Sequence, residues 1–141
     1  MLTIKRAYES AITQDGVRVL VDRLWPRGLT KEAARVDQWL RDLGPSDALR
    51  KWFGHDPAKW VEFRRRYEKE LAAPDKQELL RQLATQARKS KVTLVYSAHD
   101  EEHNQAVVLR DAILKLSKRP APATRGPSTV RAKPEVSQRR R

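Results

Sequence analysis

Residues that could bind or transform a ligand occur first in a short segment that follows an apolar run. This segment holds Asp22, Arg23, Trp25 and Arg27 and leads to a helix-start signal at Thr30. Loops at the ends of strands are where open α/β sheets bind ligands. A guanidinium offers forked N–H donors to phosphate or carboxylate oxygens, so the two arginines and the tryptophan predict a binding site for an anionic small molecule. Asp22 is the candidate catalytic carboxylate, and a purely structural ion pair with an arginine is the alternative.

A second group of candidate residues follows another β-favouring run. Ser97, His99 and Asn104 are the candidate ligand-binding residues of this group, and His103 is the candidate general base. An unperturbed imidazole titrates near neutrality, which suits a general base. Asp100 can cap the following helix, which would place His103 in its first turn. A hydrogen-bonded histidine with no chemical role is the alternative for that position.

We predict no metal site. His99 and His103 are four residues apart, a spacing that can place two imidazoles on one zinc ion in a helix. The residue after the first histidine is Asp100, however, whereas the zinc protease motif has a glutamate there. The chain has no cysteine, which excludes disulfides, thiolate catalysis and cysteine-ligated zinc. The residues identify neither a cofactor nor a reaction.

Three strands are predicted to position these two groups. Alternation of apolar and polar residues predicts a strand over Leu2–Tyr8, and Val92–Tyr96 has the composition of a central buried strand. Between them, the turn signal Asp15-Gly16 leads into a strand predicted over Val17–Leu24. A tight hairpin at this turn would make the first two strands antiparallel, and a longer connection would allow other pairings.

Helices are predicted between the second and last strands and after the last strand. Their expected start signals are Thr30 for a helix over Lys31–Leu43, Ser46 for a short helix, Asp56-Pro57 for a helix that Pro74 ends, Asp75 with Glu78, and Asp100. The order of elements predicts an α/β domain with a small, mainly parallel sheet of three or four strands and helices packed around it.

The composition divides the 141 residues into a domain over 1–116 and a basic tail over 117–141. The tail holds eight of the 30 Lys and Arg residues and a single acid, and only two large apolar residues, so we expect it to be disordered. Its cations could neutralise phosphates of nucleic acid without reading the sequence. A flexible extension that serves solubility is the alternative.

The sequence predicts neither a membrane span nor a signal peptide. No apolar stretch approaches the roughly 20 residues that a membrane-spanning helix needs. The first apolar residues are interrupted by Lys5, Arg6 and Glu9, unlike the apolar region of a signal peptide. We therefore expect a cytoplasmic protein without a membrane partner.

The four tryptophans lie within 36 residues, from Trp25 to Trp60. Tryptophans at helical spacing beside other large apolar side chains suit a core. If Trp39 and Trp52 were exposed instead, this helical region could be a partner-binding surface. Trp25 lies in a loop, where one face of its ring could stack on a ligand.

Three stretches resemble one family in the expected order. They are Val19–Leu29, Leu49–Trp60 and Thr93–Leu109, and the similarity covers about residues 2–116. The family is the short, YeaO-like branch of the bacterial domain of unknown function 488. The resemblance implies a compact cytosolic α/β domain and no assigned activity. The chain departs from the family's usual form at Ser97 and His99, where an alanine and a lysine are expected.

Overall fold

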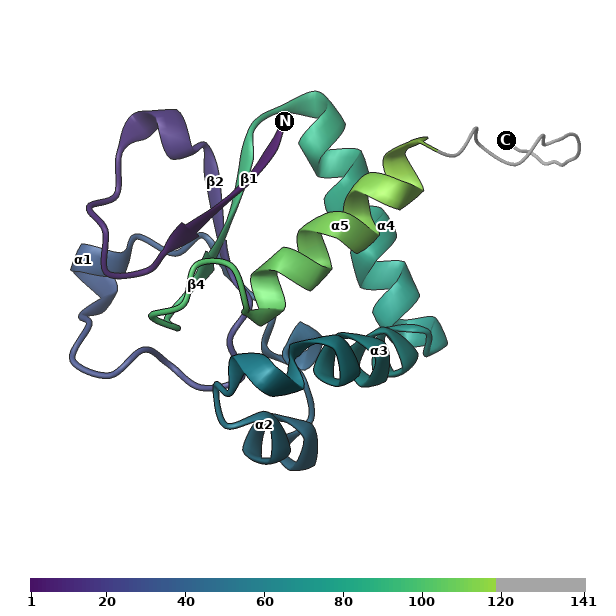
Figure 1. The fold of residues 1–141 in the computed structure, drawn as a ribbon. Helices are drawn as coiled ribbons and strands as arrows, with labels where there is room; N and C mark the ends of the chain where they lie inside the picture. Colours follow the sequence, from purple (N-terminus) through teal and green to yellow (C-terminus); the bar gives the residue numbers. More distant parts are fainter. Residues whose placement is uncertain (119–141) are drawn as a thin grey trace, which may run out of the picture.

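The computed structural model describes residues 1–118 as an α/β fold with one four-stranded sheet (Figure 1). Its strands are β1 (Leu2–Arg6), β2 (Val17–Leu20), β3 (Gln38–Trp39) and β4 (Val92–Tyr96). They lie in the order β1-β4-β2-β3, and every neighbouring pair is parallel. The predicted α/β class and mainly parallel sheet are confirmed.

Five α-helices accompany the sheet. They are α1 (Lys31–Ala34), α2 (Asp47–Phe53), α3 (Trp60–Leu71), α4 (Pro74–Lys89) and α5 (Gln105–Lys118). Helices α4 and α5 contact each other and β4, and α5 also contacts β1, so the two helices cover one face of the sheet. Helices α2 and α3 lie below the carboxyl ends of the strands in the view of Figure 1. None of the helices within residues 1–118 is long and apolar enough to cross a bilayer.

The predicted disordered tail and its proposed contact with nucleic acid fall almost wholly outside the described residues. Residues 117 and 118 belong to the last turn of α5, and the description ends there.

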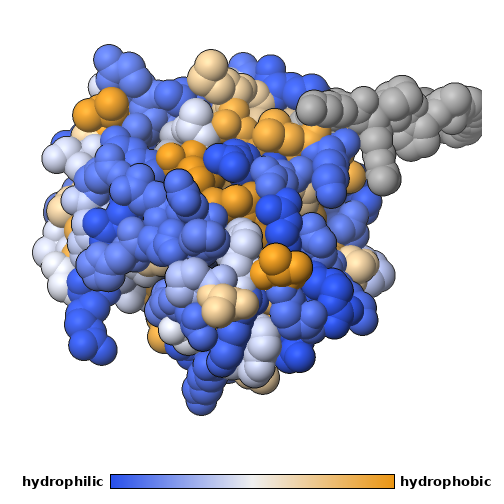
Figure 2. Space-filling model, viewed as in Figure 1, coloured by the Kyte–Doolittle hydropathy of each residue, from blue (hydrophilic) through white to orange (hydrophobic). Residues whose placement is uncertain are grey.

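The surface that the described residues present in Figure 2 is predominantly hydrophilic, and hydrophobic residues gather mainly in the upper half of that view.

The central strand β4 organises the sheet because it pairs on both edges. Its five residues are all buried, and Leu94 lies between Ile4 of β1 and Val19 of β2 in the register. A short run rich in β-branched residues with apolar side chains on both faces is typical of such a strand. The prediction of a buried central strand over Val92–Tyr96 is confirmed.

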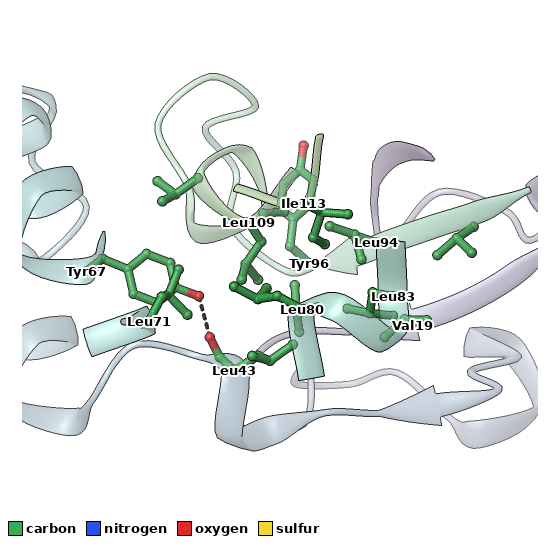
Figure 3. Close-up of a cluster of buried hydrophobic side chains, with 14 of the residues drawn as sticks. Val19, Leu43, Tyr67, Leu71, Leu80, Leu83, Leu94, Tyr96, Leu109 and Ile113 are labelled. Carbon is green, nitrogen blue, oxygen red and sulfur yellow. Dashed lines mark hydrogen bonds between the residues drawn. The ribbon is translucent and has the colours of Figure 1, made fainter. Parts of the chain in front are cut away.

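The main core lies between the sheet and helices α3, α4 and α5 (Figure 3). Tyr67 of α3 is fully buried there and donates its hydroxyl hydrogen bond to the carbonyl of Leu43. Burial raises the pKa of Tyr67 well above its usual value, so the hydroxyl remains a donor. This bond ties α3 to the segment that leads into α2, and both border the carboxyl ends of the strands.

The opposite face of the sheet has a polar cluster. Asp15 and Arg18 are both almost fully buried, and their side chains form an ion pair of 2.7 Å. Lys5 approaches the same carboxylate at 3.1 Å. Burial by itself would raise the pKa of Asp15, but hydrogen bonds from Ile12 N–H, Lys5 and Arg18 outweigh it and lower that pKa. This face is held by charge pairing and by side-chain bonds to the backbone, such as that from Arg18 Nε to Ala34 O.

The helix predicted over Lys31–Leu43 is wrong. Thr30 caps α1 as expected, but Arg35 adopts left-handed backbone angles and ends the helix after one turn. The backbone from Asp37 to Leu40 then bonds to β2, which makes Gln38–Trp39 the edge strand β3. Pairing with a distant strand outweighs the helical spacing of apolar residues, which is a local signal only.

The strand predicted over Val17–Leu24 is too long, because β2 ends at Leu20. No hairpin joins the first two strands: Gly16 leads into β2 beside Lys91, and β4 lies between β1 and β2. The Cβ of any other residue at Gly16 would lie 2.3 Å from the Lys91 carbonyl oxygen. This close approach sets where β2 begins.

Two helix starts also differ from the predictions. Helix α4 begins at Pro74, so this proline opens a helix and the predicted capping pair Asp75–Glu78 lies inside it. Helix α5 begins at Gln105, and the Asn104 side chain accepts a hydrogen bond from Val107 N–H. Asp100 instead caps the turn before α5, where it accepts the N–H bonds of residues 102 and 103.

Candidate functional site

A cleft of about 630 Å³ lies at the carboxyl ends of β1, β4 and β2. The loops after these strands, together with α2, supply most of its wall. Seven of the eight residues predicted for the site line it, namely Asp22, Arg23, Trp25, Arg27, Ser97, His99 and Asn104. The two predicted segments therefore converge, because parallel pairing of β2 with β4 brings their ends to the same edge of the sheet.

Asp22 occupies the buried floor of the cleft. One of its carboxylate oxygens accepts the Ser97 N–H at 2.9 Å, and the other accepts the Gln105 side-chain amide. Burial raises the pKa of Asp22 to about 6, although the hydrogen bonds from Ser97 and Gln105 and the nearby His55 act in the opposite direction. The carboxylate thus fastens the β2 loop to the β4 loop and to the start of α5.

Three arginines of the cleft have no carboxylate partner among the described residues. Arg6 donates to the Ala98 carbonyl at 2.9 Å, and Arg23 donates to the carbonyls of Pro45 and Gly44. Within residues 1–118, no hydrogen bond or ion pair engages the Arg27 guanidinium, and that residue is exposed. The carbonyls fix the positions of Arg6 and Arg23 without neutralising their charge.

The loop that carries Arg27 is braced at several points. The indole N–H of Trp25 donates to the Leu29 carbonyl at 2.6 Å, and its ring packs edge-on against Trp39 at 5.5 Å between centroids. The Tyr8 hydroxyl donates to the Arg27 carbonyl at 2.7 Å. The backbone of Arg27 is therefore fixed while its guanidinium remains available, as a ligand-binding side chain requires.

Reasoning from the sequence missed five residues with polar side chains that line the cleft, and these are Arg6, Tyr8, Arg50, His55 and Gln105. Arg6 and Tyr8 come from β1 and the turn after it, and Arg50 comes from α2. Of these five, His55 had the clearest sequence signal, because it follows the helix-ending Gly54. In the structure His55 has a positive φ of 57°. Such backbone strain in a residue that is not glycine is frequent at functional sites.

Arg50 has an unused donor. Its Nε is buried and has no hydrogen-bond partner within the described residues, and its only ion pair is a long one of 3.4 Å to Asp47. A buried polar group without a partner is uncommon and calls for an explanation such as a bound ligand or ion. Arg50 therefore joins Arg6, Arg23 and Arg27, and these four residues are the cleft arginines below.

The residues predicted after β4 differ in how far their polar groups are already used. Ser97 is half-buried and His99 is exposed, with His99 Nδ1 lying 3.4 Å from an Arg6 nitrogen. Asn104 is buried, and its amide donates to the Asp100 carbonyl while its oxygen accepts from Val107. Asn104 thus shapes the wall of the cleft and caps α5 with the same side chain.

His103 lies outside the lining of the cleft. The prediction that it belongs to the first turn of the last helix is wrong, because that helix begins two residues later. Its Nδ1 lies 2.9 Å from an Asp100 oxygen, and its ring packs edge-on against Trp60. Hydrogen bonds from the N–H of Glu102 and from His103 lower the pKa of Asp100. His103 is therefore not among the residues that line the cleft with Asp22.

No group of three or more His, Asp or Glu side chains within residues 1–118 is arranged to hold a metal ion.

The rings of Trp39 and Trp52, which lie outside the cleft, are covered by cations. The guanidinium of Arg41 lies 4.1 Å from the Trp39 ring, and Arg66 lies 4.3 Å from the Trp52 ring. Both rings are half-buried, so the partner-binding alternative finds no exposed tryptophan surface here.

Comparisons with known proteins identify relatives of this chain. A family model described as the inactive DUF488-N3 subclade matches residues 1–131. The uncharacterized protein YeaO of Escherichia coli (strain K12) is 41% identical over 112 residues, which are 79% of this chain and 96% of YeaO. The uncharacterized protein Rv3073c of Mycobacterium tuberculosis (strain ATCC 25618 / H37Rv) is 47% identical over 68 residues, 48% of this chain and 58% of that protein. No solved structure matches the chain. The predicted family resemblance is confirmed.

Proposed function

Because the chain belongs to the inactive DUF488-N3 subclade, we propose that it binds an anionic small molecule in the cleft without transforming it. The ligand carries a phosphate or carboxylate group. The observation that supports this proposal most directly is the set of three cleft arginines that have no carboxylate partner within residues 1–118. Their charge is left for a ligand to neutralise.

The chemistry of the lining favours an anion over a cation or a neutral molecule. Four arginines and two histidines line the cleft, against a single acid, Asp22. Both oxygens of that acid already accept hydrogen bonds from within the chain. Charge-assisted hydrogen bonds from arginine to an anion are about twice as strong as neutral ones, and they strengthen further in a partly enclosed cleft.

Binding without catalysis agrees with where the two candidate catalytic residues lie. Asp22 is tied to both neighbouring loops, whereas His103 is paired with Asp100 outside the cleft. General acid–base catalysis needs its groups within hydrogen-bond reach of one substrate. The word inactive in the family description points the same way. The catalytic roles predicted for Asp22 and His103 are therefore not part of this proposal.

The proposal is tested by thermal shift and calorimetric titration with phosphate, phosphonates and carboxylates at constant ionic strength. We expect stabilisation by at least one of these anions, with Arg27→Ala lowering its affinity roughly tenfold, the typical worth of one charged hydrogen bond. Arg27 is the best position for this variant because its guanidinium makes no bond within residues 1–118 that the substitution would remove.

Arg88→Ala is the matched control, because Arg88 is an exposed arginine of α4 and is not part of the cleft. It removes the same charge from the protein, so any general effect of net charge appears in both variants. Equal losses of anion affinity in Arg27→Ala and Arg88→Ala would refute binding in the cleft. Absence of binding by every anion in the panel would refute the proposal as a whole.

A further inference from the structure

We propose that the ligand of this cleft carries two separate anionic groups, one bound on each side of the end of β4. This inference rests on the proposed function and specifies its ligand class. It is carried by the arrangement of the cleft arginines as two pairs, Arg6 with Arg27 and Arg23 with Arg50, which different parts of the fold hold in place.

The strand order separates the two sides. Strands β1 and β2 both pair with β4 and not with each other. Because neighbouring strands lie about 4.8 Å apart, the backbones of β1 and β2 are about 10 Å apart at this edge. Arg6 is the last residue of β1 and pairs in register with Tyr96, and Arg23 follows the end of β2. The loop after β4 therefore comes between them.

The first pair is linked through Tyr8. The Arg6 guanidinium lies over the Tyr8 ring at 5.3 Å, and the Tyr8 hydroxyl donates to the backbone of Arg27. Arg27 follows β2 in the sequence, but this bond carries its loop toward the β1 side. Arg6 is further fixed by the Ala98 carbonyl. One anionic group can thus reach one anchored and one free guanidinium here.

The second pair is built on the segment between β3 and α2. Arg23 donates to the carbonyls of Gly44 and Pro45, and Arg50 lies on the first turns of α2, with its backbone N–H bonded to the Ser46 carbonyl. Arg50 lines the cleft, and its side chain is 41% exposed. Its guanidinium can therefore donate to a second anionic group, because its one ion pair within the described residues, to Asp47, is long at 3.4 Å.

Asp22 lies on the floor at the end of β2, where it is bonded to Ser97. A single anion placed over this carboxylate, between the two pairs of arginines, would be repelled by it. A molecule with two anionic groups joined by a neutral spacer avoids the carboxylate and contacts both pairs. The second group then binds at a high effective concentration, which raises affinity without new kinds of contact.

The test uses alkane bisphosphonates of increasing length and the alkylphosphonates of matching length, titrated calorimetrically into the full chain. We expect an optimal length at which the bisphosphonate binds at least about tenfold more tightly than its single-headed counterpart. Arg27→Ala and Arg50→Ala should each reduce that advantage to about onefold. Arg50→Lys should keep part of it, and Arg88→Ala should keep all of it.

Three outcomes separate this inference from the proposed function. If single-headed and double-headed ligands bind equally at every length, the two-group ligand is refuted and anion binding stands. If Arg50→Ala remains folded by circular dichroism and keeps the full advantage, the second group does not lie at Arg50 and the inference is also refuted. If no phosphonate binds but phosphate or a carboxylate does, the inference is refuted and the proposed function stands, and if no anion of any kind binds, both are refuted.

Discussion

Four of the five arginines of helices α3 and α4 have acidic partners, unlike most of the cleft arginines. On the helices, Arg65 and Arg66 pair with Glu62, and Arg81 pairs with Glu78. In the cleft, the arginines bond mainly to backbone carbonyls, and Arg50 has only a long contact with a carboxylate. Both sets belong to one basic chain. Composition alone therefore hides where its positive charge is uncompensated.

This contrast shows why a run of basic residues is a poor guide to a binding site. Arg64-Arg65-Arg66 is the most conspicuous cluster of arginines within the described residues, yet every member has an acidic neighbour on a helix surface. The cleft arginines come from three separate segments of the sequence, and the fold brings them together. Pairing, and not local density, decides which cations are left to bind an anion.

The largest effect should come from an arginine that is both paired and buried. Arg18→Met removes the 2.7 Å partner of buried Asp15 and leaves that carboxylate with Lys5 alone. We expect the free energy of unfolding to fall by about 3 kcal/mol, because loss of one partner leaves a buried charge poorly compensated. Urea denaturation measures it. If Arg18→Met lowers the free energy of unfolding no more than Arg81→Ala does at an exposed ion pair, burial does not increase the cost of losing one partner.

The next effect tests the acid of the cleft. Because the folded-state pKa of Asp22 is about 6, above the usual 3.8, the folded protein binds more protons than the unfolded chain between those values. The contribution of Asp22 to stability therefore falls as pH rises from about 4 to 6 and is lowest above that range. Asp22→Asn removes this dependence and can keep both hydrogen bonds if the Gln105 amide turns over.

We expect Asp22→Asn to be more stable than the parent protein near neutral pH by about 2 to 3 kcal/mol, with the gain vanishing near pH 4. Urea unfolding at several pH values measures the difference between the two proteins. Taking the difference cancels the opposite trends of Asp15 and the surface carboxylates, whose pKa values are lowered. A difference that is constant with pH would contradict the raised pKa of Asp22.

A smaller effect concerns repulsion among the cleft arginines. Without an anion, Arg27→Ala should stabilise the protein at low salt by about 0.5 kcal/mol, because it removes one of four like charges and no hydrogen bond of its side chain. High NaCl should abolish the gain by screening. Thermal unfolding at low and high salt measures both. The same experiment on Arg81→Ala, which removes a paired arginine, should show no gain at either salt concentration.

The smallest effect should come from the paired helix surface. Hydrogen bonds from Arg65 and Arg66 lower the pKa of Glu62 to about 2, so this carboxylate is ionised at neutral pH. Glu62→Gln removes both ion pairs, yet we expect the melting temperature to fall by only about 1 °C, because exposed pairs are well solvated. A larger fall, or a new affinity of this surface for phosphonates, would weaken the contrast with the cleft.

The parts of the fold that the sequence predicted are those with strong local signals. Val92–Tyr96 is a β-favouring run, and Ser46, Asp56 and Gly54 act as the caps expected of them. The helix predicted over residues 31–43 failed because Gln38–Trp39 pairs with β2, whose register partners lie 19 residues earlier in the chain. A local pattern contains no information about that partner.

The candidate site divides in the same way. Asp22, Arg27 and their neighbours were predicted because each segment follows a strand, and parallel strands end at one edge. Arg6 and Arg50 were missed because their positions in the cleft follow from the order β1-β4-β2 and from the placement of α2. Asn104 and Asp100 are equally good caps by residue type, and only the structure shows that Asn104 begins α5.

The central place of β4 also determines when the sheet can form during synthesis of the chain. This strand is central, yet it is the last of the four to be synthesised. A ribosome that has released residues 1–90 holds β1 and β2 without the strand that joins them, and the two cannot pair with each other in this topology. The sheet and the cleft at its edge therefore form together only after Tyr96 has left the exit tunnel. Until then, β1 and β2 each keep an edge without its partner strand, and unpaired strand edges promote aggregation.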